Sequence, residues 1–262
     1  MSNELRVDNL NFETILKDIN LNLPSGTISA LMGKSGSGKT LFLKSFFGLI
    51  QYSGEISYDG TIIVDENRSN TLKDFGLYLD IDHLDNKTVF LNLIEPLNNL
   101  GFSDSKAKKK VYEISKKFEI DFLLYKEVSS LSYSQKKLVA YIQSIIHEPK
   151  VILIDNLFDS MDSCIKNKIV KYLKELKKKN CIIIFITSNS EDLMFADNLI
   201  LIKNGRIIEN GSVKNLIQNE TLFLKNDIKL PFLIDLSYKL KAYDLIDDLI
   251  FDYDKMVDEI WK

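Results

Sequence analysis

The sequence predicts an α/β fold built on a parallel sheet that carries a phosphate-binding loop. Three observations support it: a glycine-rich loop at residues 33–40 follows an apolar strand-like run, apolar runs recur at 151–154 and 181–187, and a segment of helical period separates those two runs. A strand, a helix and a second strand in succession form a parallel unit. The chain has 262 residues, of which 45% are hydrophobic and 27% charged, which is long enough for one large or two modest domains.

Composition and charge argue against several classes of protein. The formal net charge is −3 and lysines are interspersed with acidic residues, so the one-sided basic surface of a nucleic-acid-binding protein is not expected. No apolar run approaches the roughly 18 residues of a membrane span, so a membrane role is expected to act through a partner. Cys164 and Cys181 lack a CxxC pattern, a histidine cluster and an N-terminal signal segment. We therefore expect no disulfide, no zinc site and a cytosolic location.

Short strand-like segments dominate the first part of the chain, where most of the glycines lie. Apolar patterning there predicts strands at 4–10, 19–23, 27–32, 54–58, 61–64 and 75–79. The spacing then changes to the helix period over about residues 88–147. Apolar residues recur every three or four positions at Ala107, Val111, Ile114 and Phe118, and again at Leu138, Tyr141, Ile142 and Ile145. This pattern predicts several amphipathic helices.

Strands and helices alternate again after Pro149. Between the apolar strands 151–154 and 181–187, one helix face is formed by Ile165, Ile169, Leu173 and Leu176. Two short strands are expected at 199–202 and 206–208, joined by a turn at Asn204 and Gly205. The last forty residues have helical spacing, at Leu233, Leu236 and Leu240 and then at Leu245, Leu249, Met256 and Ile260.

The loop at 33–40 matches the phosphate-loop pattern G-x-x-x-x-G-K-[ST] between a strand and a helix-like run. Its glycines let backbone N–H groups turn inward around a phosphate, and the helix offers its positive N-terminal end. Lys39 is expected to reach the β- and γ-phosphates and the Thr40 hydroxyl to ligate Mg²⁺. The predicted nucleotide-binding residues here are Gly33, Lys34, Ser35, Gly36, Ser37, Gly38, Lys39, Thr40 and Leu41.

A phosphate loop alone is compatible with kinases, GTPases, helicases and transport ATPases. The partner motif, Walker B, places an acidic residue at the end of a buried apolar strand, where it can hold the metal. The run 151–154 ends at Asp155, which is therefore the predicted second magnesium residue.

Several further motifs stand in the order found in one family. The segment 131–135, Leu-Ser-Tyr-Ser-Gln, lies about twenty residues ahead of Asp155, where that family has its LSGGQ signature. Residues 159–162 are similar to its D-loop, which ends at Asp162, and 204–211 to its closing hairpin. Over residues 4–215 the chain thus resembles the ATP-binding subunit of ABC transporters. This resemblance implies an ABC ATP-binding domain at 1–215, with an antiparallel β region and a helical subdomain at about 88–147, that binds ATP and Mg²⁺.

The C-terminal residues make this resemblance more specific. Residues 211–262, with Asp-Ile-Lys-Leu-Pro-Phe at 227–232, are similar to the C-terminal extension of energy-coupling factor ATPases. In that family two ATPases sit beneath membrane components that take up vitamins and metal ions, and the extension helps hold the ATPases together. The resemblance implies a dimerising helical extension at 216–262 and a peripheral position on the cytoplasmic side of the membrane. The alternative is a helical cap without a partner role.

The departures from the family pattern concern catalysis. Asn156 stands where the family has the glutamate that acts on the attacking water, and Ser188 where it has the switch histidine. An amide cannot accept a proton, and general-base assistance contributes about 10² to 10⁴ in rate. Hydrolysis at this chain's own site is therefore expected to be slow. Binding is expected to persist, because the amide removes a negative charge beside a polyanion.

Three other motifs also differ from the pattern. Asp80 replaces the Q-loop glutamine and is a candidate to ligate Mg²⁺ directly or through water. In the signature, Ser132 and Gln135 are retained, whereas Tyr133 and Ser134 replace the two glycines, so that a tyrosine risks a clash with the partner's nucleotide. For adenine stacking the candidate is Phe12, with core packing as the alternative.

These departures favour a particular assembly. In the family, each site joins the phosphate loop of one subunit to the signature of the other, so both sites of a homodimer would be impaired. We therefore expect a nucleotide-holding subunit of a transporter, paired with a second, more competent ATPase in a heterodimer. The alternatives are a purely structural subunit held together by ATP, and a soluble ABC-type ATPase in DNA repair or translation, which the lack of a coiled-coil insertion and of a second cassette disfavours.

Overall fold

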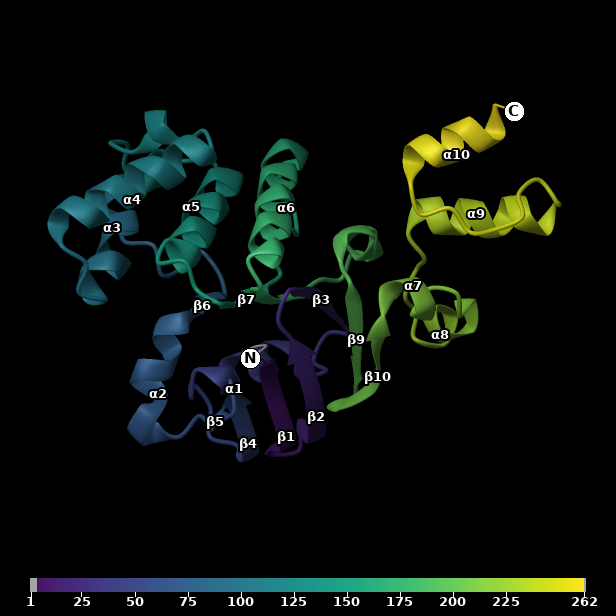
Figure 1. The fold of residues 1–262 in the computed structure, drawn as a ribbon, viewed down its shortest axis with the longest axis horizontal. Coiled ribbons are helices and arrows are strands. Elements are labelled where there is room, and N and C mark those ends of the chain that lie inside the picture. Colours follow the sequence, from purple (N-terminus) through teal and green to yellow (C-terminus); the bar gives the residue numbers. More distant parts are fainter. Residues whose placement is uncertain (1–3, 262) are drawn as a thin grey trace.

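A computed structural model describes residues 4–261 and contains two sheets and a series of helices (Figure 1). The larger sheet has six strands in the order β10-β9-β3-β8-β7-β6, and the smaller has four in the order β2-β1-β4-β5. In the larger sheet every neighbouring pair is parallel except β9 and β10. The predicted α/β fold with a parallel sheet is confirmed.

The parallel sheet carries the motifs at its carboxyl edge. Its strands are β3 (Thr27–Met32), β6 (Phe75–Tyr78), β7 (Val151–Asp155), β8 (Ile182–Ile186), β9 (Asn198–Lys203) and β10 (Arg206–Ser212). Every residue of β7 and β8 is buried, as expected for central strands covered on both faces. Because these strands run in the same direction, the residues after β3, β7 and β8 meet along one edge.

The smaller sheet is antiparallel and consists of β1 (Glu4–Phe12), β2 (Leu16–Pro24), β4 (Ser53–Tyr58) and β5 (Thr61–Ile62). The predicted strand at 61–64 is too long, because the chain leaves it to start helix α2 (Asp65–Thr71), which was not predicted. The Asn67 side chain accepts a hydrogen bond from the Val64 N–H at 3.0 Å and so closes the first turn of α2.

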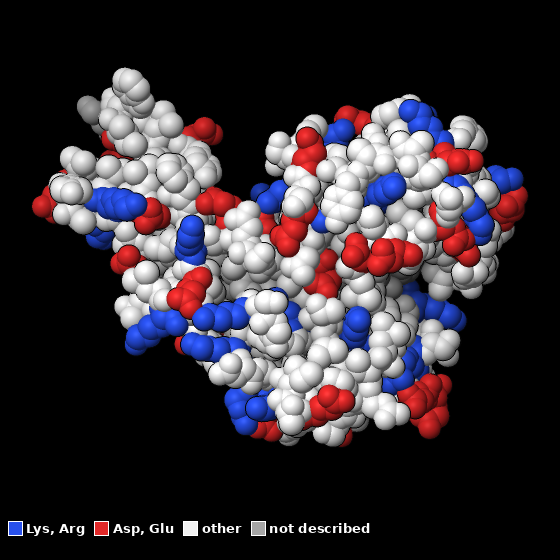
Figure 2. Space-filling model, turned by 180° about the vertical axis from the view of Figure 1, so that it is seen from behind, with Lys and Arg blue, Asp and Glu red and all other residues white. Residues whose placement is uncertain are grey.

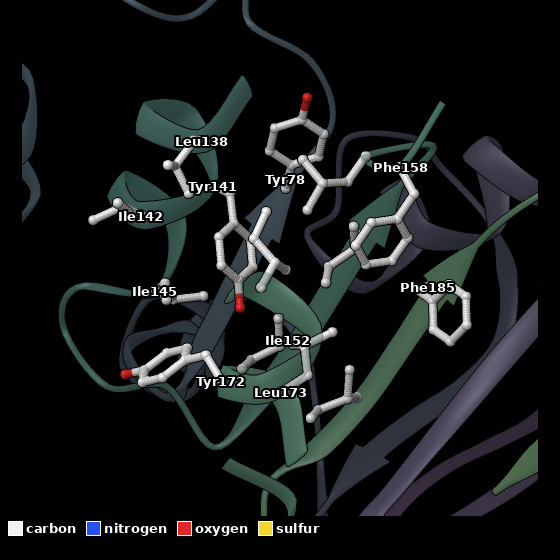
Figure 3. Packing of buried hydrophobic residues seen from close by; sticks show 14 of the residues in the cluster. Tyr78, Leu138, Tyr141, Ile142, Ile145, Ile152, Phe158, Tyr172, Leu173 and Phe185 are labelled. Carbon is white, nitrogen blue, oxygen red and sulfur yellow. The ribbon is translucent and has the colours of Figure 1, made fainter. Parts of the chain in front are cut away.

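The two faces of the parallel sheet belong to two different cores. Val151 and Leu153 of β7 face the core between the two sheets, which α1 (Lys39–Phe46) fills with Phe42 and Phe46. Ile152 and Ile154 face the opposite core, where α5 (Tyr133–Ile145) and α6 (Ser163–Lys178) pack. Figure 3 shows side chains of both helices meeting the sheet around Ile152. Because β7 is packed on both faces, Asp155 at its end has a fixed position.

The region predicted to be helical contains α3 (Val89–Asn99) and α4 (Asp104–Lys117) in addition to α5. These three helices form a group beyond the edge of the sheet at β6 (Figure 1). Within residues 4–261, no helix combines the length and apolar character that crossing a bilayer requires.

The C-terminal residues form α7 (Val213–Leu216), α8 (Glu220–Lys225), α9 (Phe232–Ala242) and α10 (Tyr253–Ile260). The helical spacing predicted through Leu245 and Leu249 is wrong, since both lie in the non-helical segment between α9 and α10. Asp244 adopts a left-handed conformation with φ of 56°, which ends α9. Figure 2 shows these helices as a separate lobe, with acidic and basic side chains mixed over this face of the molecule.

The close packing of β6 on α5 supplies a test of the fold. A Cβ at Gly76 in β6 would lie 2.3 Å from the Ser144 carbonyl oxygen and 2.9 Å from Pro149 Cγ, whereas one at Gly211 in β10 would have no neighbour nearer than 3.6 Å. Gly76→Ala is expected to lower the free energy of unfolding by about 1–3 kcal/mol through overpacking. The matched variant Gly211→Ala is expected to change it by less than about 0.5 kcal/mol. Urea unfolding of both variants checks this, and equal stabilities would contradict it.

Candidate nucleotide-binding site

The phosphate loop lies between β3 and α1, pressed against two neighbouring segments. A Cβ at Gly33 would lie 2.2 Å from the Ile202 carbonyl oxygen of β9, and one at Gly38 2.5 Å from a methyl carbon of Leu16 at the start of β2. Gly38 also has φ of 97°, which favours glycine. The loop therefore approaches its neighbours so closely that side chains are excluded at these two positions.

Lys39 points back into this loop. Its ammonium donates hydrogen bonds to the carbonyl oxygens of Gly33 at 2.8 Å and Lys34 at 2.9 Å. Burial lowers the pKa of Lys39, and the charge of Asp155 opposes that shift. The Ser37 hydroxyl is buried without a hydrogen-bond partner among the described residues. A cation and a free hydroxyl in one loop fit an anionic phosphate.

Thr40 and Asp155 meet across the loop. The Thr40 hydroxyl donates a hydrogen bond of 2.6 Å to Asp155 Oδ2 at the end of β7. Burial raises the pKa of Asp155, while the bond from Thr40 and the charge of Lys39 lower it. A hydroxyl and a carboxylate are the hard oxygen donors that Mg²⁺ prefers, with phosphate and water oxygens completing its shell. The two side chains thus fit a magnesium ion bound with a nucleotide.

Asn156 follows directly and is held against the same carboxylate. Its backbone is left-handed, with φ of 48°, and its amide nitrogen donates to Asp155 Oδ1 at 2.8 Å. Both Asp155 oxygens therefore accept a hydrogen bond from a neighbouring side chain. The amide of Asn156 is a donor at this place, and it has no basic site for a proton.

The switch segment after β8 is anchored although Ser188 itself is exposed. The Thr187 hydroxyl donates to Asp192 Oδ2 at 2.5 Å and accepts from the Asn189 N–H at 3.0 Å. Asp192 is fully buried and forms an ion pair with Lys166 of α6. Sequence reasoning missed this network, because its members are distant in the chain and follow no local pattern.

The signature segment begins helix α5. The Ser132 hydroxyl accepts from the Gln135 N–H at 3.3 Å, and the Gln135 side chain accepts from the Ser132 N–H at 3.0 Å, which is a capping box. Tyr133 is half exposed. Ser134 Oγ accepts from the Asp162 N–H at 3.2 Å, and Asp162 caps α6 by accepting from the Cys164 N–H at 2.9 Å. The signature and the D-loop thus contact each other within this chain.

Lys137 is a buried cation that sequence reasoning missed. Its ammonium donates to the carbonyl oxygens of Leu157 at 3.3 Å and Asp159 at 2.6 Å, and lies 5.1 Å from the centre of the Tyr133 ring. Burial lowers the pKa of Lys137. The lysine joins the start of α5 to the segment that follows Asp155. A lysine among the apolar residues of a helix face was the only signal in the sequence.

Asp80 and Phe12 lie at the margins of the site. Asp80 follows β6, is exposed, and accepts a hydrogen bond from the Ile81 N–H at 2.6 Å. Because β6 pairs with β7 in parallel, with Tyr78 opposite Ile154, Asp80 lies at the same sheet edge as Asp155. Phe12 is half-buried against the core between the sheets, so it packs there whatever its role toward adenine.

With this geometry established, comparison with known proteins shows the family. A sequence model described as ABC transporter matches residues 16–159, more than half of the chain. The chain belongs to the ABC transporter family. It is 28% identical over 256 residues to the energy-coupling factor transporter ATP-binding protein EcfA1 of Mesomycoplasma hyopneumoniae, covering 95% of this chain and 92% of that protein. A putative ABC transporter ATP-binding protein of Clostridium perfringens is 30% identical, covering 92% of this chain and 88% of that protein.

Solved structures agree with the sequence relatives. CbiO1 of Clostridium perfringens, described as part of the ABC transporter complex cbiONQ, has a TM-score of 0.74 and 27% identity, covering 90% of this chain and 98% of that one. An ATP-binding cassette in its ADP conformation has a TM-score of 0.73 at 20% identity, covering 86% and 98%, and supports the fold alone. The ABC-type fold and the resemblance to energy-coupling factor ATPases are confirmed, and the chain is an ABC-type ATP-binding subunit.

The raised pKa of Asp155 gives a prediction about stability. The folded state holds this proton to a higher pH than the unfolded chain, so the carboxyl contributes stability that is lost as pH rises from 3.8 through the folded pKa. Asp155→Asn removes this titration and keeps an acceptor for Thr40. The thermal midpoint of the original protein relative to the variant should therefore fall as the pH rises above about 4 in the absence of nucleotide. Differential scanning fluorimetry measures it, and a difference that grows in the opposite direction would contradict the assignment.

Proposed function

We propose that this chain is an ATP-holding subunit of an energy-coupling-factor-type uptake transporter, in which its own site hydrolyses ATP slowly. Lys39, Thr40 and Asp155 supply what binding of a magnesium nucleotide needs: a cation inside the phosphate loop and two adjoining oxygen donors. The residues that depart from the family pattern, Asn156 and Ser188, stand at the positions that act on the attacking water. The site therefore keeps the residues that bind ATP and lacks those that assist its hydrolysis.

Asn156 is the observation that carries this proposal. Its amide nitrogen donates a hydrogen bond of 2.8 Å to Asp155 Oδ1. The side chain is thus held beside the proposed Mg²⁺ ligand, and it offers a hydrogen-bond donor where the family has a base. Loss of general-base assistance costs about 10² to 10⁴ in rate. That corresponds to about 3–5 kcal/mol of activation barrier. Ser188, short, uncharged and exposed, adds to this loss at the switch position.

The pairing of subunits follows from the signature. A tyrosine at 133 places an aromatic ring at the exposed start of α5, where a partner's γ-phosphate is expected to approach. A homodimer would have this ring and Asn156 in both of its sites. A heterodimer with a more competent ATPase restores a catalytic glutamate and a glycine signature to the assembly, one in each composite site. We therefore favour the heterodimer.

The C-terminal helices offer a surface for that partner. Large apolar side chains are exposed along α9, α10 and the segment between them, at Phe232, Tyr243, Leu245, Tyr253, Val257, Ile260 and Trp261. Exposed apolar patches of this kind mark protein contacts. The ATPase core is assigned to residues 1–215 and the dimerising extension to 216–262.

The transporter role rests on the relatives. The Mesomycoplasma hyopneumoniae relative is named an energy-coupling factor transporter ATP-binding protein, and the Clostridium perfringens structure is part of an ABC transporter complex. By analogy, the chain docks from the cytoplasmic side onto membrane-embedded subunits and drives uptake of a vitamin or another micronutrient. Asp80, beside the site and ahead of α3, is assigned a water-mediated or direct role toward Mg²⁺.

Restoring the two family residues tests the proposal. The double variant Asn156→Glu, Ser188→His is expected to raise the ATP turnover of the purified chain at least about tenfold, because the carboxylate accepts the proton of the attacking water. Phosphate release at saturating Mg-ATP measures it.

The control for this variant is Asn156→Gln, Ser188→His. Glutamine has the length of glutamate without its basicity, so this chain should stay as slow as the original. Brisk hydrolysis by the unmodified chain would contradict the proposal, as would equal gains in the glutamate and glutamine variants.

A further inference from the structure

The C-terminal helices contact two segments of the nucleotide site. Lys34 of the phosphate loop forms an ion pair with Asp227, with 2.6 Å between the ammonium nitrogen and Oδ2. On the switch side, Glu191 accepts a hydrogen bond of 2.6 Å from the Phe232 N–H at the start of α9. Only four residues of the chain therefore separate two contacts that reach different segments of the site, the phosphate loop and the segment after β8.

The geometry around Asp227 directs its carboxylate at the loop. Asp227 follows α8 in a left-handed conformation, with φ of 57°, and its N–H donates to the Leu224 carbonyl oxygen at 3.2 Å. The neighbouring Asn226 side chain accepts from Lys203 of β9 at 3.0 Å. These two hydrogen bonds hold the turn that carries Asp227.

Lys34 also connects to the residue that binds phosphate. Its carbonyl oxygen accepts one of the two hydrogen bonds of Lys39, so the side chain held by Asp227 and the carbonyl that holds Lys39 belong to one residue. A nucleotide phosphate must draw the Lys39 ammonium away from that carbonyl. An ion pair that holds the Lys34 side chain resists this rearrangement.

Part of the C-terminal region is separated from the core by a hollow. A hollow of about 940 Å³ separates part of α9, α10 and the segment between them from the core, lined by Asp197, Lys214, Tyr238, Lys241 and Asp252 among others. Apolar anchoring comes from Phe223 and Ile234, which belong to the core beside α5 and α6, and from Ile228 and Leu230, which pack against it. The hollow therefore leaves one side of α9 and α10 without packed contact to the core.

We propose that Asp227 is a positioning residue for ATP binding: through Lys34 it restrains the phosphate loop, lowers the affinity for ATP and couples nucleotide binding to the C-terminal extension. By reciprocity, a nucleotide that frees Lys34 weakens the hold on the extension by the same factor. This inference requires nucleotide binding alone, and it stands whether or not the chain hydrolyses ATP slowly.

A double-mutant cycle on the full-length chain tests it, with Mg²⁺ and a non-hydrolysable ATP analogue as the probe. Asp227→Asn should tighten binding about two- to fivefold, the small effect expected for loss of a solvent-exposed ion pair. In a Lys34→Gln background, the same change at 227 should have no effect. Asp227→Glu, which keeps the charge, should bind as the original chain does.

The matched control is Asp235→Asn, which breaks the pair of Asp235 with Lys239 within α9, at 2.6 Å, away from the loop. It should leave nucleotide affinity unchanged. Hydrogen exchange gives a readout that a structural role alone would not move: the analogue should speed exchange at 220–245 in the original chain and not in Asp227→Asn. Unchanged or weaker binding by Asp227→Asn would overturn the proposal, and so would an equal gain in the Lys34→Gln background.

Discussion

The hydrogen bond between Thr40 and Asp155 is the interaction on which the site depends. It joins the first turn of α1 to the end of β7, two segments 115 residues apart in the chain, at 2.6 Å. Parallel pairing of β3 and β7 with β8 brings both segments to one edge of the sheet, and the cores on the two faces fix β7 between them. Lys39, Ser37 and Asn156 are all arranged around this bond, so nucleotide binding and its chemistry follow from one constraint of topology.

Around that bond, the proposed nucleotide-binding residues keep the family pattern, and the proposed catalytic positions, Asn156 and Ser188, depart from it. The cation of Lys39 lies inside the loop, and both oxygens of Asp155 are fixed by donors. The flanking segments are equally well fixed, by Lys137 behind the D-loop and by Asp192 behind the switch. Residues that support the site are therefore present even where catalytic groups are replaced. This combination supports our proposal that the site retains ATP.

Local patterns made most of the fold and the binding motifs predictable. The apolar run before Asp155 and the glycine spacing before Lys39 are properties of adjacent residues, so the sequence alone indicates them. Helix α2 was not predicted because its residues are polar and lack an apolar period. The helical spacing of Leu245 and Leu249 gave a wrong prediction because the left-handed backbone of Asp244 ends α9 just before them. The partners of Lys137, Asp192 and Lys34 could not be predicted, since each pair forms only when distant segments pack.

The claim that this site binds ATP and hydrolyses it slowly is tested most directly by following the bound nucleotide over time. The purified chain is loaded with Mg-ATP, freed of unbound nucleotide, and its bound nucleotide is identified at intervals over an hour. A site that holds ATP without a general base should retain ATP as the main species throughout. Conversion to ADP with a turnover near about 1 s⁻¹, at the low end of ordinary enzymes, would contradict the account.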